Sequence, residues 1–104
     1  MINLQPSIFL PSVQLTANGV TDMGCAPSNV LSLKVDGVFG GATCEIGYVS
    51  DSGAFTRYSD IAATTGNLQL ASLFLGFWSS IAVRVTNATS STNVRVHWYP
   101  QTIA

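Results

Sequence analysis

Short, regularly spaced turn signals divide this chain into many brief segments. Clusters of Gly, Asn, Asp, Pro and Ser, the residues that favour tight turns, recur roughly every 8–12 residues. The clearest are Asn18-Gly19, Asp36-Gly37, Gly40-Gly41 and Ser50-Asp51-Ser52-Gly53. The intervening segments are rich in Val, Ile, Leu, Thr and aromatic residues, and none has the period and end signals of a helix. The spacing therefore predicts an all-β protein.

The segments between the turns predict about seven strands. Their expected ranges are 12–17, 29–36, 42–50, 54–59, 67–73, 80–87 and 93–99. A chain of 104 residues suffices for one ordinary domain but not for two. We therefore expect a single antiparallel β-sandwich, jelly-roll-like or Ig-like, formed by residues 12–104 and preceded by an extended N-terminal arm, residues 1–11.

Alternation of apolar and polar residues indicates which face of each strand is buried. Four apolar rows are expected to face the core: Leu31, Leu33 and Val35; Cys44, Ile46 and Tyr48; Ile81, Val83 and Val85; Val94, Val96 and Trp98. The last two strands are expected to form a hairpin across a loop near Thr89–Ser91. Matching their apolar rows would place Arg84, Arg95, His97 and Tyr99 together on the outer face.

The stretch EIGYVSDSGAFTRY, residues 45–58, predicts a second hairpin with its loop at Ser50–Gly53. Asp51 can cap the turn, and Gly53 can adopt positive φ. Tyr48 and Phe55 are expected to form a cross-strand aromatic pair.

The first eleven residues are unusually apolar for a terminal segment. Pro6 and Pro11 favour an extended path, and a disordered tail would hold fewer apolar residues. The apolar side chains are Ile2, Leu4, Ile8, Phe9 and Leu10. Two interpretations stay open: an edge strand that packs on its own domain, or an arm that lies on a neighbouring subunit.

The uncharged stretch LASLFLGFW, residues 70–78, raises the question of a membrane segment. A membrane helix needs about 20 mainly apolar residues, and polar residues on both sides leave about nine, so no membrane contact is expected. Leu73, Phe74 and Leu75 are consecutive, and a strand cannot bury all three on one face. Together with Phe77 and Trp78, they are either covered on both faces within the domain or meet another chain.

The charge of the chain limits the classes of partner that it can bind, and its cysteine content indicates the state of its thiols. Charged residues make up 9% of the chain, and the net charge is -1, against about 25% charged residues in a typical soluble domain. Without a basic patch, nucleic acid is not an expected partner. The weakly charged surface suits a protein that works inside an assembly. The N-terminus does not resemble a secretory signal, so Cys25 and Cys44 are expected to be free, buried thiols.

The sequence contains no recognisable catalytic or metal-binding constellation. His97 is the single histidine and has no carboxylate near it in sequence, so no nucleophilic triad is expected. Zinc would need three or four ligands at short spacing, which two Cys and one His do not provide. We expect no catalytic residue, cofactor or metal. Among the aromatic residues, Tyr58 and Tyr99 are candidates for stacking on sugar rings, whereas Trp98 belongs to a core row.

Residues 37–99 carry a resemblance to a known class of protein. The order GATCEIGYVSDSGAFTRYSD, a middle strand, then IAVRVTNATSSTNVRVHWYP resembles the small β-sandwich or jelly-roll proteins of tailed bacteriophage virions. These are head decoration or cement, head-fibre or tail-associated components. The resemblance implies a non-enzymatic virion protein that is made in the host cytoplasm and assembled onto a capsid or tail, often as a trimer. It carries over no residue roles.

The predicted function is therefore that of a capsid cement or decoration protein that binds the major capsid protein or another virion protein and its own copies. The expected contact regions are Met1–Pro11, Leu73–Trp78 and the face with Arg84, Arg95, His97 and Tyr99. The alternative is a glycan- or host-surface-binding β-sandwich module of a phage tail or fibre.

Overall fold

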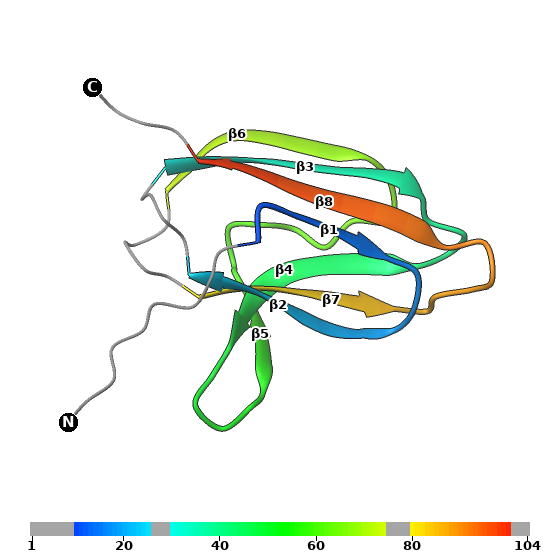
Figure 1. Ribbon diagram of the computed structural model, residues 1–104, viewed down its shortest axis with the longest axis horizontal. Helices are drawn as coiled ribbons and strands as arrows, with labels where there is room; N and C mark the ends of the chain where they lie inside the picture. Colours follow the sequence, from blue (N-terminus) through cyan, green and yellow to red (C-terminus); the bar gives the residue numbers. More distant parts are fainter. Residues whose placement is uncertain (1–9, 26–29, 75–79, 101–104) are drawn as a thin grey trace.

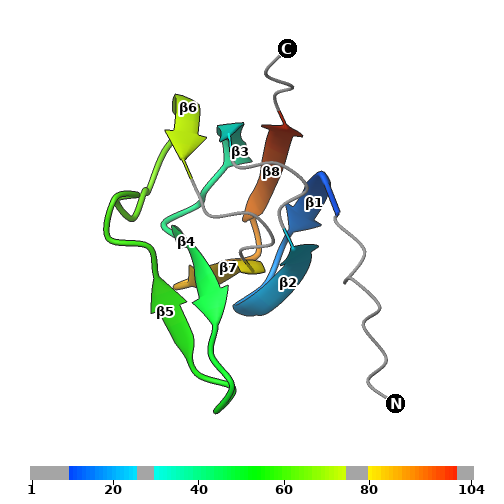
Figure 2. The same ribbon diagram turned by 90° about the vertical axis from the view of Figure 1, so that its left-hand side faces the viewer.

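The computed structural model describes residues 10–25, 30–74 and 80–100, and its described part contains eight strands and no helix. The strands are β1 (Ser12–Leu15), β2 (Gly19–Cys25), β3 (Val30–Val38), β4 (Thr43–Val49), β5 (Phe55–Arg57), β6 (Leu68–Phe74), β7 (Ser80–Thr86) and β8 (Asn93–Pro100). They form two antiparallel four-stranded sheets that pack face to face as a sandwich (Figures 1 and 2). The prediction of an all-β sandwich is confirmed.

The pairing of the strands is nested. β1 pairs with β8, β2 with β7, β3 with β6, and β4 with β5, which gives the sheet orders β1-β8-β3-β6 and β2-β7-β4-β5. This is the order of a long hairpin rolled into two sheets, the jelly roll. The sequence left open a jelly-roll-like or an Ig-like sandwich, and the strand order is that of the jelly roll.

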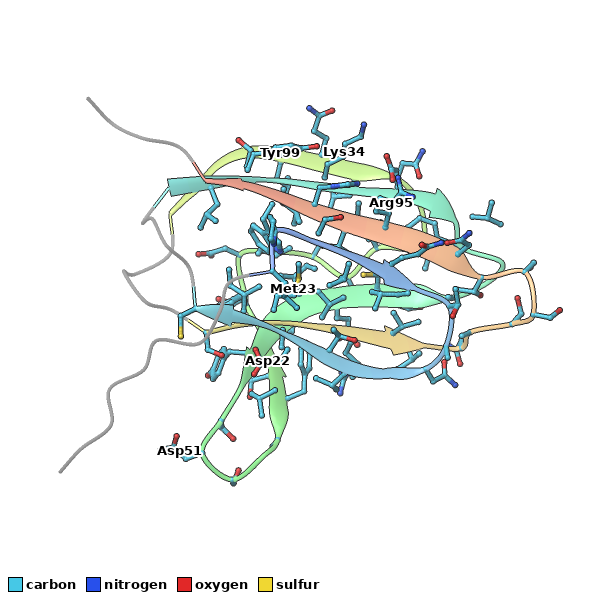
Figure 3. All side chains as sticks on the ribbon, viewed as in Figure 1. Asp22, Met23, Lys34, Asp51, Arg95 and Tyr99 are labelled. Atoms are coloured by element: carbon cyan, nitrogen blue, oxygen red, sulfur yellow. The ribbon has the colours of Figure 1, made fainter. Side chains whose placement is uncertain are left out.

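The sequence prediction missed β2. Its residues, Gly19–Cys25, alternate poorly, and the pairing with β7 shifts register between Asp22 and Gly24. The irregularity turns the side chain of Met23 inward, where it is fully buried between the two sheets (Figure 3). A β-bulge of this kind breaks the period of two that identifies a strand in a sequence.

The core contains all the expected aliphatic residues of the four predicted apolar rows, together with Cys44 and Trp98. Tyr48 is only half-buried. Trp98 lies opposite Leu33 on the neighbouring strand and is 2% exposed. The rows of β3 and β8 belong to one sheet and those of β4 and β7 to the other, so the two pairs of rows meet across the sandwich.

The expected hairpin of the last two strands is wrong. β7 pairs with β2 and β4, whereas β8 pairs with β1 and β3 in the other sheet. The loop between them crosses from one sheet to the other, a separation of about 10 Å. Both strands still bury their apolar rows, but the rows face each other across the core instead of lying side by side.

The β4–β5 hairpin is confirmed, and Gly53 in its loop has the expected positive φ, 86°. The aromatic pair is wrong by one residue, because the loop also includes Ala54. Tyr48 lies opposite Thr56, and Phe55 lies opposite Val49. The ring of Tyr48 instead contacts Tyr58, with centroids 5.3 Å apart.

The four edge strands are short or irregular. β1 has 4 residues and β5 has 3. β2 is bulged, and the pairing of β6 with β3 shifts register between Leu31 and Leu33. Short and bulged edges disfavour the addition of a strand from another chain. The faces and ends of the sandwich are therefore more suitable contact surfaces than its edges.

Candidate functional site

The outer face of the β1-β8-β3-β6 sheet is the first candidate surface. Each strand places alternate residues on it, and the register aligns Arg95 with Gln14 and Asp36, His97 with Ser12 and Lys34, and Tyr99 with Ser32. Gln69 on β6 lies opposite Lys34. We call this surface the outer polar face; it consists of Ser12, Gln14, Ser32, Lys34, Asp36, Gln69, Asn93, Arg95, His97 and Tyr99.

Arg95 is the unpaired charge of the outer polar face. Asp36, its cross-strand neighbour, forms an ion pair with Lys34, with Nζ and Oδ2 3.4 Å apart. Among the described residues, Arg95 takes part in no hydrogen bond or ion pair. Its guanidinium, which can present a rigid fork of donors to a carboxylate, is thus available to a partner.

The two rings of the outer polar face lie next to each other along β8. His97 and Tyr99 are stacked, with centroids 6.1 Å apart and an angle of 15° between their planes. Tyr99 is 51% exposed. Figure 3 shows Lys34, Arg95 and Tyr99 on the side of their sheet that points away from the other sheet. Three of the four residues predicted to share a face therefore do so.

Arg84 does not join them. It lies on β7, on the outer face of the opposite sheet, because β7 and β8 belong to different sheets. Its Nε and Nη2 donate to Oε1 of Glu45 at 3.0 and 2.8 Å, and its guanidinium carbon lies 4.7 Å from the ring centroid of Phe55. Arg84 thus joins β7 to β4 and β5 within the molecule. The predicted cluster of Arg84 with Arg95, His97 and Tyr99 is wrong.

One end of the sandwich is the second candidate surface. Cys25 pairs with Ser80, Val30 with Phe74, and Leu31 with Pro100, so the ends of five strands lie together on the left of Figure 1. Leu10 also lies there, since its amide donates to the carbonyl of Met23 at 2.8 Å. We call this the arm end and the opposite end the loop end.

Most of the apolar residues predicted to contact a partner lie outside the described residues. These are Ile2, Leu4, Ile8, Phe9, Leu75, Phe77 and Trp78. Leu73 and Phe74 extend β6 as backbone partners of Leu31 and Val30. Leu10 is described and is 44% exposed. The segments that contain the predicted contacts join the described chain at the arm end.

Leu10 and Pro11, the described part of the predicted arm, are joined to the sandwich. Leu10 hydrogen-bonds to β2, and the carbonyl of Pro11 accepts from the amide of Trp98 on β8 at 2.7 Å. The two bonds connect the edge of one sheet to the other sheet. These residues therefore fix where the N-terminal segment leaves the sandwich.

The thiols and the remaining candidate groups offer little chemistry. Cys25 and Cys44 are both free, but only Cys44 is buried as expected, whereas Cys25 is half-buried. Burial, aided by the nearby charge of Glu45, raises the pKa of the Cys44 thiol from 9.0 to about 12, so this thiol is a poor nucleophile at neutral pH.

No group of three or more His, Cys, Asp and Glu within the described residues could hold a metal ion. No helix in the described part of the chain could span a membrane.

Of the two tyrosines considered for sugar stacking, only Tyr99 is exposed. Tyr58 is half-buried, contacts Tyr48, and donates its hydroxyl to the carbonyl of Ser80 at 2.5 Å. The alternation that directs Leu31, Leu33 and Val35 to the core implies an outer face for Lys34 and Asp36. It does not connect these two residues with Arg95 and His97. That connection requires the pairing of β3 with β8, for which the sequence contains no local signal.

Comparison of the chain with known protein families, curated proteins and solved structures found no significant match.

Proposed function

We propose that this protein is a non-enzymatic structural component of a virion, a cement or decoration protein that binds coat subunits and its own copies. It is made in the host cytoplasm and acts in the assembled particle. The jelly roll supports this at the level of analogy, because viral capsid domains use that architecture, as do lectins.

The observation that carries the proposal is the convergence at the arm end. Leu10, Phe74 and Ser80 border the two segments whose apolar residues are predicted to contact a partner, and their strands or backbone bonds bring them to one end of the sandwich. A chain with 9% charged residues has little electrostatic repulsion between copies. We assign contact with the coat and with further copies, in a trimer, to the arm end.

Repetition of this contact over a shell provides the mechanism. Each copy needs only a modest interface, because several copies bound to a shell and to one another dissociate far more slowly than one copy alone. A closed symmetric oligomer would present the same end of each subunit to the coat. The shell is stiffened passively, without any chemical step.

The test is co-sedimentation of the purified protein with empty coat shells, combined with its mass in solution by light scattering. The variant Leu10→Ser removes an apolar side chain at the arm end. Burial of a leucine is worth about 1.5–3 kcal/mol, so binding should weaken about tenfold or more. Phe77→Ser should behave in the same way, with little change in the free energy of unfolding.

Val38→Ser is the matched control. Val38 is 57% exposed, against 44% for Leu10, and it ends β3 at the loop end. This variant should sediment with shells as the unmodified protein does. A monomer that does not bind shells would refute the proposal, as would equal losses from Leu10→Ser and Val38→Ser.

A further inference from the structure

The outer polar face has the composition of a carbohydrate-binding surface and not that of a protein interface. Nine of its ten residues are polar or charged, and Tyr99 alone offers a large exposed ring. Val38, which lies opposite Asn93 at the loop end of the face, adds an exposed aliphatic side chain at its border. The centre of a stable protein interface is depleted in charge and rich in apolar groups. The proposed contact with the coat therefore suits the arm end better than this face.

Its aromatic residues are arranged for stacking. Tyr99 is half-exposed, and the near-parallel ring of His97 supports it from the adjacent outward position of β8. The negative face of an aromatic ring attracts the weakly positive C–H groups on one side of a pyranose. A sugar ring can therefore lie on Tyr99 without displacing any contact of the core.

Polar groups that could bind sugar hydroxyls lie beside Arg95 and His97, on the loop-end side of Tyr99. The amide nitrogen of Gln14 donates to Oδ1 of Asn93 at 2.7 Å, which orients both amides. Between β3 and β6 lies a shallow hollow of about 330 Å³, lined by Lys34, Val35, Asp36, Asn67, Leu68 and Gln69. Its size is at the lower limit of small-ligand sites.

The net charge of the outer polar face favours an acidic sugar over a neutral one. Two of the four basic residues of the chain, Lys34 and Arg95, and one of the five acidic residues, Asp36, lie on it. With His97 neutral, the face therefore carries +1, while the whole chain carries -1. Since Lys34 is paired with Asp36, a carboxylate from outside would bind the free guanidinium of Arg95.

We propose that the outer polar face binds an acidic oligosaccharide, with Tyr99 stacked on one pyranose ring and Arg95 paired with the carboxylate of another residue. Arg95 and Tyr99 are four residues apart on one strand, which separates them by about 13 Å. That span corresponds to two or three sugar units. The proposal concerns a different surface from the coat-binding arm end and is independent of it.

The experiment is calorimetric titration of the full-length protein with three acidic probes: a galacturonate tetramer, a hyaluronan tetrasaccharide and a sialylated trisaccharide. Maltotetraose is the neutral comparison, and tetraglutamate represents an acidic protein segment. At least one acidic saccharide should bind saturably, more tightly than maltotetraose and tetraglutamate. Arg95→Gln and Tyr99→Ala should each weaken this binding about tenfold or more, whereas Tyr99→Phe keeps the ring and should retain most of it.

Ser52→Asp is the control for net charge, because it makes the chain more negative by one unit, as Arg95→Gln does, at an exposed position of the β4–β5 loop. It should alter affinity by less than about twofold. Equal binding of tetraglutamate would mean a general anion surface and overturn the proposal, as would equal binding of maltotetraose. So would failure of all three acidic probes. Arg95→Gln and Tyr99→Ala should still co-sediment with shells, because the coat contact is assigned to the arm end. Loss of saccharide binding in these variants would then leave the coat-binding proposal intact.

Discussion

Replacement of Thr92 by valine tests how the loop end is held together. Thr92 is 3% exposed, and its hydroxyl donates to the carbonyl of Phe39 at 2.8 Å and accepts from the amide of Thr89 at 2.9 Å. It thereby joins the β7–β8 loop, which crosses between the sheets, to the β3–β4 turn. Valine has nearly the same shape, so Thr92→Val removes these bonds without creating a cavity.

The expected loss of stability follows from the groups left behind. A buried polar group without its partner costs about 1–3 kcal/mol. The carbonyl of Phe39 keeps the hydrogen bond that it accepts from the amide of Ala42 at 2.9 Å, and the amide of the exposed Thr89 can turn to water. The loss therefore lies at the lower end of that range, and we expect the free energy of unfolding to fall by about 1 kcal/mol. For a domain of this size, that lowers the melting temperature by about 4–8 °C.

Urea unfolding followed by circular dichroism measures this effect, and the midpoint should fall by about 0.5 M. Thr56→Val is the control, because Thr56 is exposed on β5 and its side chain has no hydrogen bond among the described residues. It should change stability by less than about 0.5 kcal/mol. A similarly small change for Thr92→Val would refute the view that this hydroxyl locks the crossing loop.

Three further predictions concern the β2-β7-β4-β5 sheet. A Cβ on Gly47 would lie 1.9 Å from the Thr56 carbonyl oxygen on β5, so Gly47→Ala should destabilise the β4–β5 hairpin by several kcal/mol. Gly66→Ala has open space and should leave the melting temperature nearly unchanged. Because the folded protein keeps the Cys44 thiol protonated to about pH 12 while the unfolded chain ionises near pH 9.0, stability should fall as pH rises between these values. The slope in a urea-midpoint series should be smaller in Cys44→Ala. Glu45→Gln should cost about 0.5–1 kcal/mol at low salt and less in 1 M salt, since the Arg84 pair is partly exposed. A cost that did not depend on salt would contradict this.

The alternation of side chains predicted the faces of the strands but not their neighbours. Val83 and Val96 are core residues whichever strands they pair with, and their buried positions were therefore predictable. The loop between β7 and β8 can close a hairpin or cross to the second sheet, and its sequence does not distinguish the two. The choice depends on long-range pairing, chiefly of β8 with β3 and of β7 with β4.

The same distinction decides how much of the candidate site could be predicted. Arg95, His97 and Tyr99 alternate on one strand, so their common face follows from the period of two. Arg84 lies on another strand, and its grouping with them depended on the hairpin that does not form. Its partner Glu45 is 39 positions away in sequence. The bulge in β2 interrupts the alternation of its side chains, so β2 could not be predicted from that alternation.

Hydrogen–deuterium exchange of the protein, free and bound to empty coat shells, tests the assignment of the coat contact most directly. Backbone amides that become buried by a partner exchange more slowly. We predict slower exchange on binding in peptides from the arm end, which include Leu10 and the stretch from Phe74 to Ser80. Peptides from the loop end, Phe39–Ala42 and Asn87–Thr92, should exchange at unchanged rates. Protection at the loop end, or no protection anywhere despite binding, would contradict the assignment.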